Sequence, residues 1–303
     1  MKNAEHIPKK EGILVTIGMQ KGGVAKSTNA THLAAALGER GKRVLLWDID
    51  ENHGATKIFG IPPNGFQTTW NVLKGDSSAT EAIIEFDDLE SDVELPENVD
   101  FIPSSRALEG IDAELTKADR FFNPNEILID HIRNVRALNR YDYILLDTGP
   151  TASPTIRGAL LTSDFYILSC VPEKLCIESL GEALTDIQNA KRPGRNENMV
   201  LIGLILSCMD RRKNLAKEYE RKIQQQFLDA EQNSVKFNAT ISSAAAIEKA
   251  YEAQKTLLQF EPNHKVSHQY RELAEEFEQR VGQHYAPAEK ETYQEPQREL
   301  ANA

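Results

Sequence analysis

The sequence predicts an α/β fold, in which a doubly wound and mainly parallel sheet carries helices on both of its faces. Three observations support this class. Short β-rich apolar runs recur along the chain, helical patterns separate them, and several runs end in glycines or carboxylates. We expect strands at residues 12–19, 42–50, 99–105, 141–149, 164–171, 198–207 and 234–241.

The first strand runs directly into a glycine-rich loop, and a helix is expected from about Ser27. Leu33, Ala34 and Leu37 recur at helical spacing, so they should face inward. A strand, a glycine turn and a helix in this order form the local arrangement that phosphate-binding sites use.

The middle of the chain is harder to assign. Residues 51–99 are irregular and acidic, with several weak helical patches whose bounds the pattern does not define. Helical patterns fill residues 106–119 and 124–140. Helices of roughly 10–18 residues are expected between the later strands.

The alternation of strands and helices predicts one folded domain over residues 12–282. Residues 1–11 are expected to be a flexible N-terminus. Residues 283–303 are polar and cannot bury a core, so a disordered tail is expected there.

Composition favours a cytosolic protein. The 303 residues are 40% apolar, enough for a real core, and carry a formal net charge of −11. No apolar run approaches the length of about 18 residues that a membrane span needs, and the polar N-terminus lacks a signal core. Cys170, Cys176 and Cys208 show no metal-ligand spacing, which favours buried, reduced thiols. Because the chain is acidic, any contact with DNA or anionic lipid must come from a local patch.

The stretch GMQKGGVAKSTNA, residues 18–30, forms the expected glycine loop. Backbone N–H groups and the positive end of the helix dipole would converge there on an anion. Lys26 would then reach the β- and γ-phosphates, Ser27 would ligate Mg²⁺, and Thr28 could contact the α-phosphate. The alternative is a glycine-rich turn without a ligand. The expected nucleotide contacts are Gly22, Gly23, Val24, Ala25, Lys26, Ser27 and Thr28.

Ala25 stands where the usual phosphate-loop pattern has glycine. With a negative φ its methyl group is harmless, whereas a positive φ strains the loop by roughly 1–2 kcal/mol. We expect the loop to tolerate this residue, because every other phosphate-contacting residue is present.

Three aspartates follow predicted strands. Asp147 lies at the end of a buried apolar run, at the sheet edge where open α/β sheets bind ligands, and would hold the water shell of Mg²⁺. A helix N-cap is the alternative role for Asp147. Asp48 and Asp50 end another run and lie on one face of it. Because unpaired buried carboxylates are costly, this pair indicates a nearby metal or attacking water.

The segments KGGVAKST, VLLWDIDENHGAT and YDYILLDTGPT resemble ATPases of the ParA/MinD family, which carry a deviant Walker A motif. The usual forms in that family are KGGVGKT, a strand end Asp-x-Asp-Pro-Gln-Gly, and Asp-Thr-Pro-Pro. The resemblance covers about residues 12–280 and is nearest to ParA-type DNA partition ATPases. It implies a P-loop NTPase fold that binds ATP and Mg²⁺.

The resemblance also implies residue roles. Lys21 would be the signature lysine, which crosses the interface of an ATP-sandwich homodimer to the partner's nucleotide. Asp50 would orient the attacking water, Asp48 would support Mg²⁺ and the switch region, and Lys26 would complete the catalytic set. Slow hydrolysis, stimulated by a partner, is expected. The departures at Glu51-Asn52-His53 and Gly149-Pro150 lie in presumed switch loops, where they would affect the timing of hydrolysis.

Family members differ in what the ATP-bound dimer binds. Non-specific DNA binding needs several basic residues on one surface. A cytoplasmic protein with such a surface would be associated with the nucleoid. A ParB-type centromere-binding protein, or a cargo adaptor such as those of carboxysome-positioning relatives, would be the partner. The segment ISSAAAIEKA departs from the arginine-bearing segment of many relatives. The DNA-contact candidates are Arg211, Lys213, Lys217, Arg221, Lys249 and Lys255.

Other activities fit less well. A MinD-like membrane helix needs a basic polar face, whereas the last helical pattern pairs an apolar face with a net acidic one, so no membrane binding is expected. An iron–sulfur relative needs cysteines before Cys170, and there are none. A GTPase would carry Asn-Lys-x-Asp, but Ser-Cys-Met-Asp fills the comparable strand end, leaving Asp210 as a weak candidate for contact with adenine. The apolar face of the last helical pattern, mentioned above for the membrane alternative, consists of Tyr270, Leu273, Phe277 and Val281.

Overall fold

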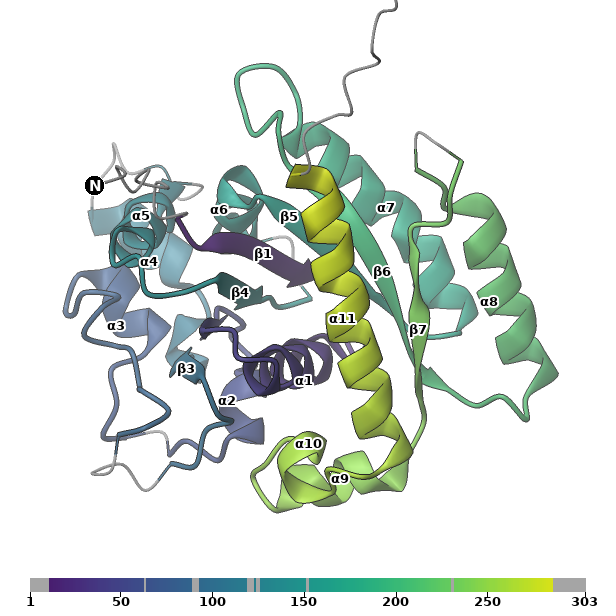
Figure 1. Ribbon diagram of the computed structural model, residues 1–303. Helices are drawn as coiled ribbons and strands as arrows, with labels where there is room; N and C mark the ends of the chain where they lie inside the picture. The colour runs from purple at the N-terminus through teal and green to yellow at the C-terminus, as the bar shows by residue number, and fades with distance from the viewer. Residues whose placement is uncertain are drawn as a thin grey trace, which may run out of the picture.

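A seven-stranded, all-parallel sheet forms the centre of the protein (Figure 1). The computed structural model describes residues 11–62, 64–88, 93–118, 123, 126–150, 153–229 and 232–285. The strand order is β3-β2-β4-β1-β5-β6-β7, which confirms the doubly wound α/β class. The strands are β1 (Ile13–Gly18), β2 (Val44–Asp48), β3 (Val99–Ile102), β4 (Tyr143–Asp147), β5 (Phe165–Cys170), β6 (Val200–Met209) and β7 (Lys236–Ser242).

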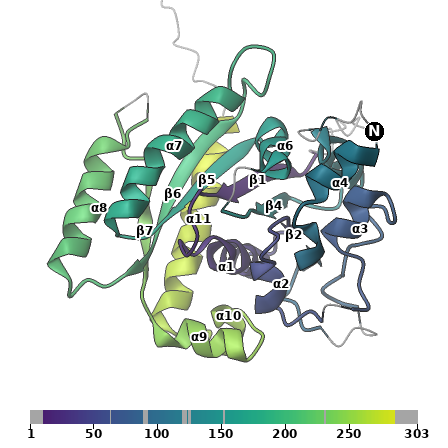
Figure 2. The same cartoon turned by 180° about the vertical axis from the view of Figure 1, so that it is seen from behind.

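Helices cover both faces of the sheet, and side chains alternate between them along each strand. Val15 and Ile17 pack toward α1 and α11, whereas Leu14 packs toward the opposite layer. The first layer holds α1 (Lys26–Glu39), α2 (Gly54–Ile58), α9 (Ala245–Glu252), α10 (Leu257–Phe260) and α11 (Lys265–Tyr285). The second layer, nearer the viewer in Figure 2, holds α3 (Thr69–Lys74), α4 (Ile111–Ala118), α5 (Ile129–Ala137), α6 (Pro154–Thr162), α7 (Lys174–Ala190) and α8 (Asn214–Gln226).

The sheet register brings the functional strand ends to one level. Asp147 pairs in register with Ile17 of β1 on one side and with Asp48 of β2 on the other. The loop that follows β1 therefore starts beside two carboxylates. This is the sheet edge where ligands of open parallel sheets bind.

The first helix confirms its sequence pattern. It begins at Lys26, one residue before the expected start, and Leu33, Ala34 and Leu37 are fully buried. Gly41, just past its end, has a φ of 76°, a left-handed conformation that glycine adopts without strain.

The segment that the sequence left unassigned contains two short helices, α2 and α3. It also returns to the edge of the sheet, where Ile84 and Phe101 exchange backbone hydrogen bonds and so cover strand β3. Of the two helical patterns that follow, the first resolves into a short 3-10 turn (Arg106–Leu108) and α4. The second is the shorter helix α5.

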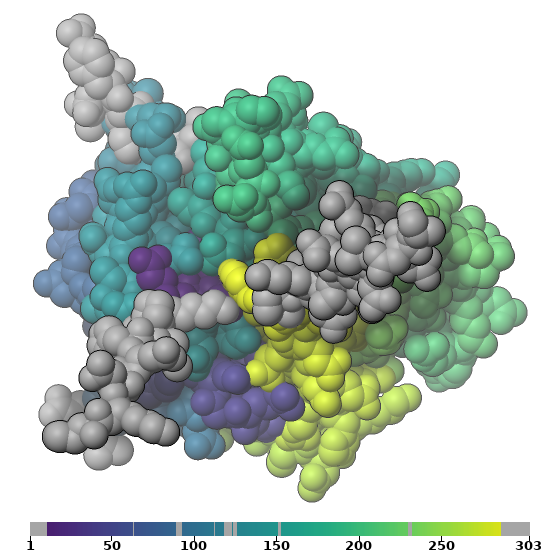
Figure 3. Space-filling view, turned by 45° about the horizontal axis from the view of Figure 1, so that its top comes forward, coloured from purple at the N-terminus to yellow at the C-terminus, as the bar shows by residue number. Residues whose placement is uncertain are grey.

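The last helix docks on the core as its pattern predicts. Tyr270, Leu273 and Phe277 are fully buried, and Val281 is nearly so. Arg271 of this helix pairs with Glu39 of α1 at 2.6 Å. In Figure 3 the yellow surface of α11 accordingly lies against the purple surface of the early chain.

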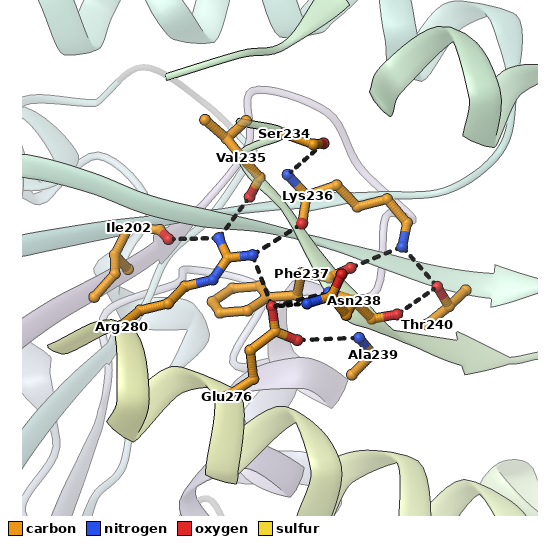
Figure 4. A network of polar contacts seen from close by, with 10 residues as sticks. All are labelled: Ile202, Ser234, Val235, Lys236, Phe237, Asn238, Ala239, Thr240, Glu276 and Arg280. Carbon is orange, nitrogen blue, oxygen red and sulfur yellow. Dashed lines mark hydrogen bonds and ion pairs between the residues drawn. The ribbon is translucent and has the colours of Figure 1, made fainter. Parts of the chain in front are cut away.

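Polar contacts fix the same helix to the free edge of the sheet (Figure 4). Glu276 accepts hydrogen bonds from the backbone N–H groups of Asn238 and Ala239, at 3.0 and 3.1 Å, and so occupies donors of edge strand β7. Arg280 donates, at 3.0 Å each, to the backbone carbonyls of Ile202, Val235 and Lys236.

Helix α11 continues to Tyr285, three residues past the expected domain end at 282. The expected flexible start, apart from Glu11, and the expected tail from residue 286 lie outside the described residues. Within the described part, no helix combines the length and the apolar character that crossing a bilayer requires.

Candidate nucleotide and metal site

The loop between β1 and α1 has an open inner surface. Gly22 and Gly23 are exposed, and a Cβ added to either would meet no atom within 4 Å. Gly23 has a φ of 72°, which suits glycine. The loop leads into the N-terminus of a 14-residue helix, whose unpaired N–H groups and dipole favour an anion at this point.

Ala25 has a positive φ, which is the strained of the two backbone conformations considered for it. Its φ is 64° and its ψ 28°, a left-handed conformation that costs an L-residue about 1–2 kcal/mol. Its carbonyl accepts the backbone N–H of Asn29 at 2.8 Å, so the residue is fixed as the N-cap of α1. The structure thus keeps the backbone path that glycine would give, at the cost of strain in the loop.

Lys26 folds back over this loop. Its Nζ donates to the backbone carbonyl of Lys21 at 2.8 Å, and the residue is only 6% exposed. Burial lowers the pKa of Lys26, while the carboxylates of Asp147 and Asp50 act in the opposite direction. A buried ammonium beside open backbone N–H groups is suited to binding phosphate oxygens.

The side chain of Lys21 points elsewhere. Its Nζ lies 3.3 Å from Glu173 Oε2, at the start of α7. The Glu173 side chain is 67% exposed, and exposed ion pairs contribute at most about 1 kcal/mol. Lys21 can therefore leave this partner at little cost. Glu173 was not identified from the sequence, because only the fold brings it beside the loop.

Asp147 is a buried carboxylate at the end of β4. In the described part of the chain, neither oxygen has a partner of ordinary hydrogen-bond geometry. Burial, together with the nearby Asp48 carboxylate, raises the pKa of Asp147 well above its ordinary value. The Ser27 hydroxyl and the Lys26 ammonium lie near enough to act in the opposite direction. The oxygens of this buried carboxylate therefore remain available to a further cation, such as a metal ion.

This arrangement fits Mg²⁺. Mg²⁺ is commonly held by one or two carboxylates together with substrate phosphates and waters, so a full protein cage is not required. The described residues accordingly contain no group of three or more His, Cys, Asp or Glu side chains placed to hold a metal. Asp147 and Ser27 lie at the phosphate loop, where a metal bound to nucleotide would complete their interactions.

Asp48 has a different environment from Asp147. Its Oδ2 accepts the backbone N–H and the hydroxyl of Thr56 at 3.0 and 2.7 Å, and its Oδ1 accepts the backbone N–H of Asp50 at 3.0 Å. Burial raises the pKa of Asp48 to about 7. The contacts shown connect β2 to α2, and the metal role expected for Asp48 stays a prediction.

Asp50 lies just beyond β2 and is almost fully buried. Its Oδ1 accepts both the backbone and side-chain N–H groups of Asn52, at 2.9 and 3.0 Å. A Cβ at position 149 would lie only 2.7 Å from this oxygen. Gly149, one of the departures from the family pattern, therefore leaves the space that the Asp50 side chain occupies.

A buried hydrogen-bond network links this loop to the rest of the fold. Ser169 of β5 donates to the carbonyl of Val24 at 2.5 Å and accepts from the Asn29 amide at 2.8 Å. The other end of the Asn29 amide accepts from Ser207 of β6 and Tyr270 of α11, at 2.9 Å each. No sequence pattern predicted this network, because its members come from four separate elements.

A pocket adjoins the N-terminus of α1, between α1, α2 and α9. Its lining includes Ser27, Thr28, Lys57 and Tyr251 but not Asp210, the candidate for contact with adenine. Asp210 instead binds its neighbour Arg212 through Nε at 2.9 Å and Nη2 at 3.0 Å, which lowers the pKa of Asp210 to about 2.

The basic candidates do not form one continuous surface. Helix α8, which carries Lys217 and Arg221, and helix α9, which carries Lys249, lie on different sides of the molecule (Figure 1, Figure 2). Arg211 pairs with Glu220 at 3.5 Å, and Lys255 pairs with Glu94 at 2.8 Å. The other four are exposed: Lys213, Lys217, Arg221 and Lys249.

Comparisons with known proteins agree with this geometry. Residues 12–201 match the model of a family described as AAA domain. The chain is 27% identical to the sporulation initiation inhibitor protein Soj of Bacillus subtilis over 270 residues, covering 88% of this chain and 98% of Soj. It is 29% identical to the chromosome partitioning protein ParA of Caulobacter vibrioides, covering 71% and 77%.

Among solved structures, a plasmid partition protein of Borrelia burgdorferi bound to AMPPNP is 25% identical. It has a TM-score of 0.69, and the likeness covers 89% of this chain and 99% of that one. The phosphate-loop residues, the sheet order and these relatives agree. The chain belongs to the ParA family of P-loop ATPases.

Proposed function

We propose that this ATPase works as an ATP-sandwich homodimer that binds DNA without sequence preference and segregates a plasmid or chromosome. Its adaptor would be a ParB-type centromere-binding protein or a functionally similar cargo adaptor. The protein would act in the cytoplasm, associated with the nucleoid.

The observation that carries the proposal is the difference between the two lysines of the loop. Lys26 is buried against its own loop, whereas Lys21 extends away from it to a weak, exposed partner, Glu173. A cation that can leave its site at little cost is suited to reaching the nucleotide of a second protomer. Exposed Leu175 and Leu215, in the first turns of α7 and α8, add apolar surface at the same edge of the sheet.

The proposed catalytic roles combine these side-chain positions with the family resemblance. The loop N–H groups and Lys26 would bind and orient the phosphates, and Asp50 would position the attacking water. Mg²⁺, held by Ser27 and Asp147 with support from Asp48, would neutralise charge on the phosphate oxygens. Lys21 of the partner protomer would stabilise the charge that develops on the transferring phosphoryl group. Hydrolysis would then require dimer closure, so ATP acts as a switch.

DNA binding is proposed for the basic residues near the carboxyl edge of the sheet and on α8 and α9. In one protomer these basic residues are scattered over the surface, and a dimer would present twice as many of them to DNA. A membrane output is not favoured, because the apolar face of α11 is buried against the core.

A mobility-shift assay with ATP, ADP or no nucleotide, repeated over a salt series, tests this proposal. We expect DNA binding in the presence of ATP but not with ADP or without nucleotide, and the affinity should fall steeply as the salt concentration rises. Lys213→Glu combined with Lys217→Glu should abolish the shift, while Lys74→Glu, on α3 at the other end of the same helix layer (Figure 2), should not. ATP-dependent binding to anionic liposomes without any DNA shift would contradict the proposal and favour a MinD-like output.

A further inference from the structure

Two cysteines lie against each other beneath the nucleotide loop. Cys170 ends β5 and Cys176 lies in the first turn of α7, and both are fully buried. Their Sγ atoms are 2.8 Å apart. The bond of a disulfide is about 2.05 Å long, so less than about 1 Å of movement separates this contact from a covalent bond.

The chain around the two cysteines touches the nucleotide loop at two points. Ser169, next to Cys170, donates to the carbonyl of Val24, and Glu173 pairs with Lys21. Val24 also packs in the same apolar cluster as both cysteines. A change in the bonding of the two sulfurs would therefore act directly on the loop and on the lysine it carries.

The two thiols are not equivalent. Cys176 Sγ accepts a hydrogen bond from the backbone N–H of Val171 at 3.3 Å and is hydrogen-bonded to Cys170 Sγ. The hydrogen bond from Cys170 lowers the pKa of Cys176, with smaller contributions from the Val171 N–H and the Lys21 ammonium, against the effect of burial. The same hydrogen bond raises the pKa of Cys170. The lower pKa favours Cys176 as the attacking sulfur, and its contact with Cys170 places the second sulfur to resolve it.

We propose that Cys170 and Cys176 form a reversible disulfide under the nucleotide loop, with peroxide as oxidant, and that this bond slows ATP turnover. The Cys176 thiolate attacks a peroxide oxygen, the O–O bond breaks, and a sulfenic acid and hydroxide result. Cys170 sulfur then attacks Cys176 sulfur, the S–O bond breaks, and the thiol proton leaves with the hydroxyl as water. The sulfurs together lose two electrons, which peroxide gains. A thiol reductant reverses the bond by exchange.

The effect on turnover follows from the ring that the bond closes. This ring contains Glu173, so oxidation restricts the segment that holds Lys21 on its own protomer. Lys21 would then leave less readily for the partner's nucleotide. This part rests on the proposed function, whereas disulfide formation does not.

The bond can be detected directly by mass spectrometry. Cys208 is the remaining cysteine of the chain and is exposed, so Cys208→Ser provides a clean background. Lys174 separates the two cysteines, so trypsin places them in different peptides, residues 158–174 and 175–191. After hydrogen peroxide treatment we expect these peptides to be linked, and to separate on reduction. Their absence as a linked pair, under conditions that oxidise Cys208 in the parent, would overturn the proposal.

Turnover is measured on the same samples, with Cys170→Ala in the Cys208→Ser background as the matched control. Oxidation should lower the ATPase rate about threefold or more in the protein that keeps the pair, reversibly, and leave the control unchanged. A linked pair with an unchanged rate would overturn the regulatory half. If the reduced protein hydrolyses no ATP, the proposed function fails, while the linked peptides still decide the disulfide.

Discussion

Asp48 and Asp147 are paired in register across two central strands, and both are fully buried at the edge of the sheet that carries the nucleotide loop. Asp48 is satisfied by Thr56 and by the backbone of Asp50, whereas Asp147 has no hydrogen bond of ordinary geometry within the described residues. Two neighbouring buried carboxylates thus differ, because Asp48 accepts several hydrogen bonds and Asp147 accepts none of ordinary geometry within the described residues. This asymmetry indicates that Asp147 is held ready for a cation.

Replacing Asp147 should separate stability from activity. Asp147→Asn replaces a buried carboxylate, whose oxygens make no hydrogen bond of ordinary geometry within the described residues, by a neutral amide, so the nucleotide-free protein should become more stable, by about 1 kcal/mol or more at pH 8. ATP hydrolysis with Mg²⁺ should fall by about tenfold or more, because the metal loses its carboxylate. Urea denaturation and ATPase assays check the two expectations. A variant that is less stable and fully active would contradict this account.

Relieving the strain at Ala25 should also raise the stability of the nucleotide-free protein. Ala25→Gly removes the strain of a left-handed alanine, worth about 1–2 kcal/mol, and part of this is offset by the greater freedom of glycine in the unfolded chain. We expect a net gain of about 0.5–1 kcal/mol in the free energy of unfolding without nucleotide. Gly22→Ala is the matched comparison, because Gly22 has open space around it and no positive φ. Equal or lower stability in Ala25→Gly would refute the strain.

The residues of the loop should separate binding from hydrolysis. Lys26→Ala or Lys26→Gln should lose ATP binding, because the buried ammonium is the cation proposed to bind the phosphates. Lys21→Ala and Asp50→Ala should keep binding and lose most hydrolysis. Fluorescent-nucleotide titration and ATPase assays on the same preparations measure both effects. Turnover in Asp50→Ala equal to that of the parent would remove Asp50 from the mechanism.

Position 149 gives a further test of the Asp50 geometry. Gly149→Ala would place a methyl carbon only 2.7 Å from Asp50 Oδ1, which is too close for a non-bonded contact, so the carboxylate must move. We expect hydrolysis to fall by about tenfold, with ATP affinity changed by less than about threefold. If hydrolysis is unaffected, the observed position of Asp50 does not matter for turnover.

The buried histidine of α1 predicts a loss of stability in mild acid. His32 is fully buried, donates from Nδ1 to the carbonyl of Thr28 and accepts the Leu257 N–H at Nε2. Burial lowers the pKa of His32 to about 4, against 6.5 for the unperturbed side chain. The unfolded chain therefore binds the proton first as pH falls. The stability contributed is complete above pH 6.5 and is lost between about pH 6.5 and 4, in total about 3 kcal/mol.

Urea denaturation across this pH range measures the effect. His32→Gln should be less stable overall but should show a flatter dependence on pH between 6.5 and 4. His131, which is only partly buried, provides the comparison through His131→Gln. A slope in His32→Gln equal to that of the parent would show that another group causes the acid loss.

The sequence predicted the strands, the loop and the carboxylates at the strand ends well. Each of these depends on a local signal: an apolar run, a glycine cluster or a polar residue at the end of a run. It did not predict Glu173, Thr56 or the Asn29 network, because these residues meet only through the sheet order. It also left the φ of Ala25 open, since the conformation is imposed by the loop as a whole.

The most direct test of the central claim mixes two inactive variants. Lys21→Ala keeps Asp50, and Asp50→Ala keeps Lys21, so a mixed dimer has one complete site if the lysine acts across the interface. In an equal mixture half of the dimers are mixed, and the rate should recover to about a quarter of that of the parent. If the mixture stays as inactive as its components while mixed dimers form, Lys21 serves its own protomer, and the sandwich mechanism is wrong.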